Sequence, residues 1–79
     1  MNRWHWTNPA PGVLRLAGAP AEVRYEPRDD TDERYFVAYV NGRPVFRTDS
    51  LLLAEIAAEN RIGELVRIGL LDDPRREPA

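Results

Sequence analysis

The fold is decided by residues 35–48, which read YFVAYVNGRPVFRT. Aromatic and β-branched residues, which are enriched in strands, dominate both halves of this stretch. Between the halves stands Asn41-Gly42, a pair that accepts a positive φ at both central positions of a type I′ turn. The stretch therefore predicts a β-hairpin that is closed by a two-residue turn.

A two-residue turn also fixes which side chains share a face of the hairpin. The more apolar face, which we expect to pack on a helix, carries Tyr35, Val37, Tyr39, Pro44, Phe46 and Thr48. The opposite, mixed face carries Phe36, Ala38, Val40, Arg43, Val45 and Arg47. We expect this mixed face to be covered by the N-terminal arm, a second subunit, a ligand or the aliphatic stems of its own arginines.

Two further strands are predicted before the hairpin, at residues 13–17 and 22–26, where apolar and polar residues alternate. The loop that follows them holds four carboxylates between positions 29 and 33. Their spacing does not follow the EF-hand loop. We interpret the loop as a solvated hairpin tip, with a weak divalent-ion site as the alternative.

The C-terminal third predicts helical structure. Thr48, Asp49 and Ser50 are three successive N-cap candidates before residues 51–60, which are rich in leucine and alanine. Residues 61–71 fit either a helix or a strand, and we favour a second short helix over residues 64–70, with Gly63 as the break.

The two ends of the chain are predicted to lie outside the sheet. Pro9 and Pro11 favour an extended arm over residues 1–12, and residues 72–79 read as a flexible tail. Trp4 and Trp6 would share one face of a short strand. We expect them to cap the bottom of the core, with an exposed docking pair as the alternative.

Together these elements predict a single small α+β domain over residues 1–79. It is an antiparallel β-meander of three or four strands, packed against one main C-terminal helix, with a second short helix. The predicted core comprises Leu14, Leu16, Val23, Tyr25, Tyr35, Val37, Tyr39, Phe46, Leu52, Leu53, Ile56, Leu65 and Val66.

Composition excludes several kinds of chemistry. The 79 residues include no cysteine, and all eleven basic residues are arginine, so disulfides, thiolate nucleophiles and lysine Schiff bases are excluded. His5 is the only histidine, and Ser50 is a cap candidate rather than a nucleophile. We therefore expect no enzyme activity, no cofactor and no metal site.

The chain is also expected to be cytoplasmic. It has no apolar run that could span a bilayer, and its first residues lack the apolar segment of a secretory signal. Its use of arginine without lysine is typical of a high-GC genome, which favours a bacterial source.

The remaining expectation is a small interaction module that binds another protein, with homodimerisation as one form of that role. Tyrosine, tryptophan and arginine dominate protein interfaces, and a free sheet edge can accept a strand from a partner. The predicted partner-binding residues are those of the mixed hairpin face and the arm: Phe36, Arg43, Val45, Arg47, Trp4 and Trp6.

Nucleic-acid binding is the alternative. The order of strands and helix over residues 35–58 resembles, in outline, the arm-type DNA-binding modules of phage integrases and HicB-like antitoxin folds. The segments LAEIA (53–57), IGELV (62–66) and IGLL (68–71) resemble fragments of winged or MerR-type helix-turn-helix regulators. These resemblances imply DNA contact through an arginine–aromatic sheet face or a C-terminal helix pair. The diagnostic motifs of these families are missing, and a net charge of −2 disfavours nucleic acid as a partner.

Overall fold

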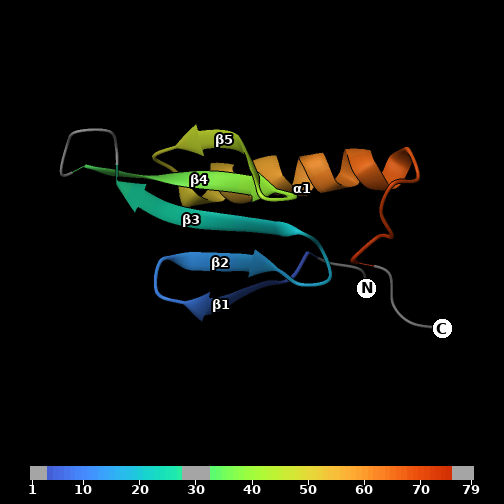
Figure 1. Cartoon of the computed structure of the whole chain (residues 1–79), viewed down its shortest axis with the longest axis horizontal. Helices are drawn as coiled ribbons and strands as arrows, with labels where there is room; N and C mark the ends of the chain where they lie inside the picture. The colour runs from blue at the N-terminus through green and yellow to red at the C-terminus, as the bar shows by residue number, and fades with distance from the viewer. Residues whose placement is uncertain (1–3, 28–32, 76–79) are drawn as a thin grey trace.

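Five antiparallel strands form one sheet, and a single helix lies across one face of it (Figure 1). The structure is a computed structural model that describes residues 4–27 and 33–75. The strands follow one another in chain order across the sheet. Their bounds are β1 Trp6–Ala10, β2 Val13–Leu16, β3 Ala21–Pro27, β4 Arg34–Val40 and β5 Arg43–Thr48, and the helix α1 spans Leu51–Arg67.

The predicted α+β class is confirmed, but the strand count is five rather than three or four. The additional strand is β1, which lies at one edge of the sheet, within the segment that the sequence analysis predicted as an arm outside it. Pro9 is tolerated there because it lies in an irregular stretch of the β1–β2 register, between Thr7 and Ala10. The Asn8 side chain donates hydrogen bonds across this stretch to the carbonyl oxygens of Val13 (2.7 Å) and Ala10 (3.0 Å).

The β4–β5 turn has the predicted geometry. Asn41 and Gly42 have φ values of 55° and 77°, as a type I′ turn requires. The first pairs of the hairpin, Val40 with Arg43 and Tyr39 with Pro44, also match the prediction.

The register beyond those pairs is wrong, because β5 contains an extra residue. Ala38 pairs with Phe46 rather than with Val45, so Val45 is a β-bulge that opposes no residue of β4. A bulge moves every later side chain of its strand to the other face. Phe46 therefore shares the face of Ala38, and Arg47 shares the face of Val37.

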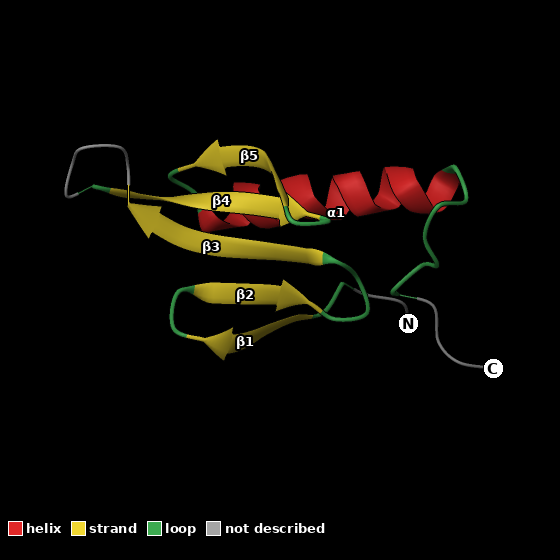
Figure 2. Ribbon diagram, in the orientation of Figure 1, coloured by secondary structure: helices red, strands yellow, loops and turns green. Residues whose placement is uncertain are grey.

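The helix packs on the face of the hairpin opposite to the one predicted. It lies against β3, β4 and β5, behind the sheet in the view of Figure 2. The core between the layers consists of Leu16, Ala21, Val23, Ala38, Val40, Ala54, Ala58, Ile62 and Leu65. Tyr35 and Tyr39, predicted as core, lie half-buried on the far face, and Tyr25 and Phe46 are exposed because the helix does not reach over them.

Small side chains decide which side of α1 faces the sheet. Ala54, Ala58, Ile62 and Leu65 follow one another along a single stripe, and the two alanines are completely buried. Ala38 of β4, also completely buried, belongs to the same cluster. Small residues on both surfaces let the helix axis come close to the sheet, which larger side chains at these positions would prevent.

The leucine-rich side of α1 is consequently in solvent, which corrects the predicted core. Leu52, Leu53 and Ile56 are 64%, 50% and 39% exposed. At 3.6 residues per turn, Leu52 and Ile56 lie about 160° and 200° around the helix axis from Ala54. A side chain at that angle cannot reach the sheet while Ala54 faces it.

One helix replaces the two that were predicted. Ser50 caps its start, as expected, by accepting a hydrogen bond from the Leu53 amide on its hydroxyl oxygen (3.3 Å). Gly63 does not break the helix, since an interior glycine costs only about 1 kcal/mol relative to alanine. The helix ends instead at Arg67, and Gly69 beyond it has a φ of +81° that lets Leu70 N–H bond to the Leu65 carbonyl (2.8 Å).

The described part of the predicted tail folds back on the start of the chain. The Arg75 guanidinium lies 4.3 Å from the ring centroid of Trp4, and Pro74 packs beside Gly18. Residues 76–79 and the acidic positions 29, 30 and 32 lie outside the described residues. The divalent-ion alternative for that loop therefore stays a prediction.

In the described parts of the chain, α1 is neither long nor apolar enough to cross a bilayer, and no other helix is present there.

The orientation of α1 predicts different stabilities for two matched truncations in the same helix. Ile62→Ala should lower the free energy of unfolding by about 2–5 kcal/mol, because Ile62 is fully buried. Leu52→Ala should change it by less than about 0.5 kcal/mol in dilute solution, because Leu52 faces water. Urea unfolding followed by circular dichroism measures both values. Equal losses, or a larger loss for Leu52→Ala, would contradict the orientation.

Candidate functional site

The structure does not bring the predicted mixed-face residues together. Phe36 is half-buried and packs against the core on the helix side of the sheet, whereas Arg47 lies on the opposite side. Val45 is the bulged residue of the β5 edge, and Arg43 is exposed beside the turn. These residues therefore do not form one continuous face.

The two tryptophans join the ends of the chain to the helix. Both are half-buried and pack against the core, which confirms the expected capping role. The Trp6 indole nitrogen donates a hydrogen bond to a carboxylate oxygen of Glu59 (2.8 Å), and Trp4 stacks under Arg75. With these contacts, the pair has a structural role.

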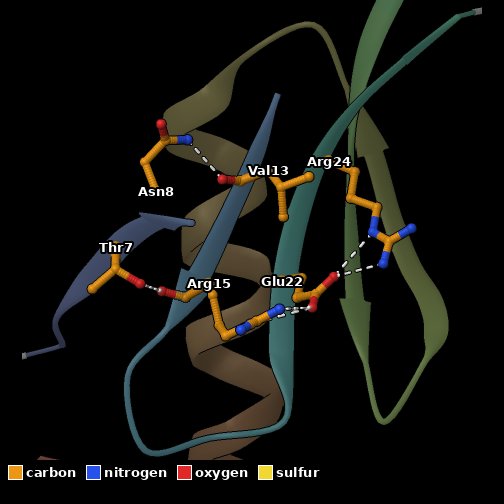
Figure 3. A network of polar contacts seen from close by, with 6 residues as sticks. All are labelled: Thr7, Asn8, Val13, Arg15, Glu22 and Arg24. Carbon is orange, nitrogen blue, oxygen red and sulfur yellow. Dashed lines mark hydrogen bonds and ion pairs between the residues drawn. The ribbon is translucent and has the colours of Figure 1, made fainter. Parts of the chain in front are cut away.

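A network of charged side chains covers the sheet face that has no helix, which we call the open sheet face. Figure 3 shows Arg15 of β2 and Arg24 of β3 reaching the Glu22 carboxylate from its two sides. Their N–O distances are 3.2 Å and 2.9 Å. One carboxylate thus holds two guanidinium groups, and the trio has a net charge of +1.

Tyrosines of β4 extend this network. Arg24 lies 5.5 Å from the ring centroid of Tyr39, whose hydroxyl donates a hydrogen bond to Glu26. Arg47 lies 6.0 Å from the ring centroid of Tyr35. Val37 sits between these rings in β4 and is only 1% exposed, although no helix or strand of the described residues is layered over this face. The network therefore shields an apolar residue by laying amphipathic side chains over it.

The charged and polar side chains of the open sheet face stabilise one another. Hydrogen bonds from Arg24 lower the pKa of the Glu22 carboxyl, with a further contribution from Arg15, while burial opposes the shift. The pKa of Tyr39 is raised, chiefly by its hydrogen bond to Glu26. A hollow of about 340 Å³ lies next to the trio, lined also by Asn41 and Gly42.

The second candidate surface is apolar. The solvent side of the first turns of α1 carries Leu52, Leu53 and Ile56, which we call the outer helix face. Phe46 and Val45 of β5 are also more than 40% exposed. Glu55, on a neighbouring side of the helix, has a raised pKa because it is partly buried and lies near Glu59. A single exposed aliphatic side chain is common on a protein surface. Exposed aliphatic side chains on successive turns of one helix mark a binding surface.

Both edges of the sheet are protected against strand addition. Pro44 and the Val45 bulge interrupt the edge strand β5, and Pro9 with its irregular register interrupts β1. The expected docking of a partner strand along a free edge is therefore disfavoured.

Comparisons of this chain with protein-family models, with curated proteins and with solved structures find no match.

The outer helix face escaped the sequence analysis, although a signal for it is present. Ala54, Ala58, Ile62 and Leu65 recur at helical spacing over more than three turns, whereas the leucines occupy only the first two. Choosing the core-facing stripe by the number of helical turns that it spans, rather than by the size of its side chains, would have placed the leucines on the solvent side of the helix.

The charged trio predicts a pH-dependent contribution to stability from Glu22. Because its folded-state pKa is lowered, ionised Glu22 stabilises the fold above its unfolded-state pKa, and this contribution is lost as the pH falls through the folded-state value. Both arginines are more than half exposed, so screening limits the effect. Glu22→Gln should lower the free energy of unfolding by about 0.5–1 kcal/mol at pH 7.

The same comparison at pH 3 or below should show a smaller difference, and 1 M NaCl should reduce the difference at pH 7. Glu64→Gln, which removes an exposed i,i+3 pair with Arg61, is the control for an ordinary surface ion pair. A Glu22→Gln effect that is independent of both pH and salt would contradict the electrostatic origin.

Proposed function

We propose that this protein is a non-enzymatic interaction module that binds another protein chain through the outer helix face. The observation that carries the proposal is the exposure of Leu52, Leu53 and Ile56 on successive turns of one helix. Burying such side chains is worth about 1.5–3 kcal/mol each when exposure is complete, so a partner that covers them gains substantially.

The arrangement favours a helical mode of recognition. An amphipathic helix with apolar residues four positions apart, as at Leu52 and Ile56, is a common way to dock into a groove or against another helix. The blunted edges of the sheet disfavour the alternative mode, in which a partner adds a strand. Of the residues predicted from the sequence, Val45 and Arg43 are exposed on β5 and remain candidates for contact with a partner.

Nucleic-acid binding is the second candidate, and one observation favours it. Arg15, Arg24 and Arg47 lie on the same open sheet face as Tyr35 and Tyr39, which is the kind of surface that contacts phosphates and stacks bases. Glu22 and Glu26 share that face and offset most of its positive charge. The predicted helix-turn-helix-like pair has no counterpart, because α1 is the only helix in residues 4–27 and 33–75.

Co-purification from the native host tests the proposal. Tagged wild-type chain should retain a protein partner, a second untagged copy included, and Leu52→Glu should reduce the retained amount at least tenfold. Ile68→Glu is the matched control, because Ile68 is similarly exposed at 66% but is the C-cap residue, at the opposite end of α1 from Leu52. Equal retention by the wild type and Leu52→Glu would contradict the proposal.

Fluorescence anisotropy with labelled single-stranded RNA and duplex DNA at 50 mM salt tests the second candidate function, nucleic-acid binding. The proposal predicts no saturable binding at micromolar protein. Binding that weakens steeply with salt and is lost in Arg47→Glu would favour nucleic acid instead.

A further inference from the structure

The hollow beside the trio of Arg15, Glu22 and Arg24 lies where two turns of the sheet meet. The Asn41 amide of the β4–β5 turn donates a hydrogen bond to the Pro20 carbonyl of the β2–β3 turn (2.8 Å). Residues of both turns and all three members of the trio line the hollow, which has a volume of about 340 Å³. Sites for small molecules begin at roughly 300 Å³, so the hollow is large enough for a small ligand.

The ion pairs of the trio are complete within the chain, but each arginine keeps one nitrogen free. Arg15 donates from Nε and Nη2 to one oxygen of Glu22 (3.4 and 3.2 Å), and Arg24 uses the same two nitrogens on the other oxygen (3.0 and 2.9 Å). Within residues 4–27 and 33–75, Nη1 of neither guanidinium forms a hydrogen bond or an ion pair. Because Glu22 already restrains both side chains, a ligand that accepts from the Nη1 groups has less side-chain entropy to remove.

The hollow carries an excess of one positive charge. Its lining holds two arginines and one glutamate, and the other lining residues are uncharged. The Glu22 side chain is 22% exposed, whereas Arg15 and Arg24 are 55% and 52% exposed. An anion that approaches from solvent therefore meets the guanidinium groups before it meets the carboxylate. Glu26 is bound to the Tyr39 hydroxyl and does not line the hollow.

The arrangement of the donors favours a phosphate group over a carboxylate. Arg15 and Arg24 reach Glu22 from its two sides, as Figure 3 shows, so their free nitrogens belong to two separate groups. Asn41 adds a neutral amide that has no hydrogen-bond partner among the described residues. The two oxygens of a carboxylate lie in one plane and suit a single guanidinium. A phosphate monoester has three terminal oxygens, which can accept from donors on several sides.

We propose that this hollow binds the phosphate group of a small phosphomonoester, held by Nη1 of Arg15, Nη1 of Arg24 and the Asn41 amide. The apolar wall of Ala19 and Pro20 is the contact for the organic part of the ligand. The ion pairs of the trio remain in place when the ligand binds. The site and the outer helix face belong to opposite sides of the sheet, so this function is additional to the proposed one and does not rest on it.

Titration of the full chain with inorganic phosphate, followed by ¹H–¹⁵N NMR at pH 7.5 and constant ionic strength, tests the proposal. Saturable shifts are expected for the amides of residues 19–24 and 39–42 and for the Nε–H signals of both trio arginines. The dissociation constant should be on the order of 1–10 mM, because exposed arginines bind anions in competition with water and salt. One site of this strength does not retain RNA or DNA at micromolar protein.

Three variants separate the proposed donors from the rest of the surface. Arg15→Gln removes one of the two cations and should raise the dissociation constant for phosphate at least fivefold. Asn41→Gly keeps a residue that accepts the positive φ of the turn, removes only the amide, and should raise it about twofold. Arg61→Gln is the matched control, because Arg61 is 49% exposed and paired with a glutamate but lies on α1. It should leave the constant unchanged, and circular dichroism checks that each variant is folded.

Acetate at the same ionic strength is the carboxylate arm of the experiment, and it should bind at least fivefold more weakly than phosphate. Equal affinities for the two anions would overturn the assignment to phosphate. The absence of saturable shifts up to 50 mM phosphate would overturn the site itself, as would equal affinities of the wild type and Arg15→Gln.

Leu52→Glu distinguishes this site from the outer helix face. The variant should bind phosphate as the wild type does, even though it should lose the protein partner. Loss of phosphate binding in folded Leu52→Glu would contradict the placement of the phosphate site beside the trio, whereas a failure of the co-purification experiment leaves that site standing.

Discussion

The close contact between the alanines of α1 and the small residues of the sheet is the constraint on which the rest of the structure depends. Ala54 and Ala58 are completely buried in the cluster that includes Ala21 and Ala38. Contacts between small side chains are favourable only at short range, so they place the helix close to the sheet and fix its rotation about its own axis. Once that rotation is set, the position of every other residue of α1 follows.

Both uncovered faces of the protein are consequences of this packing. A single helix covers only one side of the sheet, so the other side is shielded by arginines, tyrosines and glutamates that bind one another above Val37. The rotation of α1 meanwhile turns Leu52 and Ile56 to solvent. The charged face is satisfied within one chain, whereas the apolar face is not, and this difference is why we place the binding surface on the helix.

The parts of the fold that depend on local signals could be predicted from the sequence. The Asn41-Gly42 turn and the Ser50 cap each follow from the geometry of a few neighbouring residues. The predictions that failed concern features that depend on contacts between residues far apart in the sequence. The bulge at Val45 reverses the faces of β5, and it has no signature in the stretch that predicted the hairpin. Side-chain size misled the prediction of the helix core, because leucines bury more area than alanines but cannot approach a sheet as closely. The bulge also separates the residues of the predicted mixed face, so that Phe36 and Arg47 lie on opposite sides of the sheet.

Thiol reactivity in the folded chain tests the rotation of α1 most directly, since a cysteine placed at either position is the only one present. Ala58→Cys and Leu52→Cys are compared with a thiol reagent at submicromolar protein concentration. We predict that the cysteine at position 52 reacts at nearly the rate of an unfolded chain, and that the one at position 58 reacts orders of magnitude more slowly, because it must wait for opening of the fold. Fast reaction at position 58 with protection at position 52 would contradict the account.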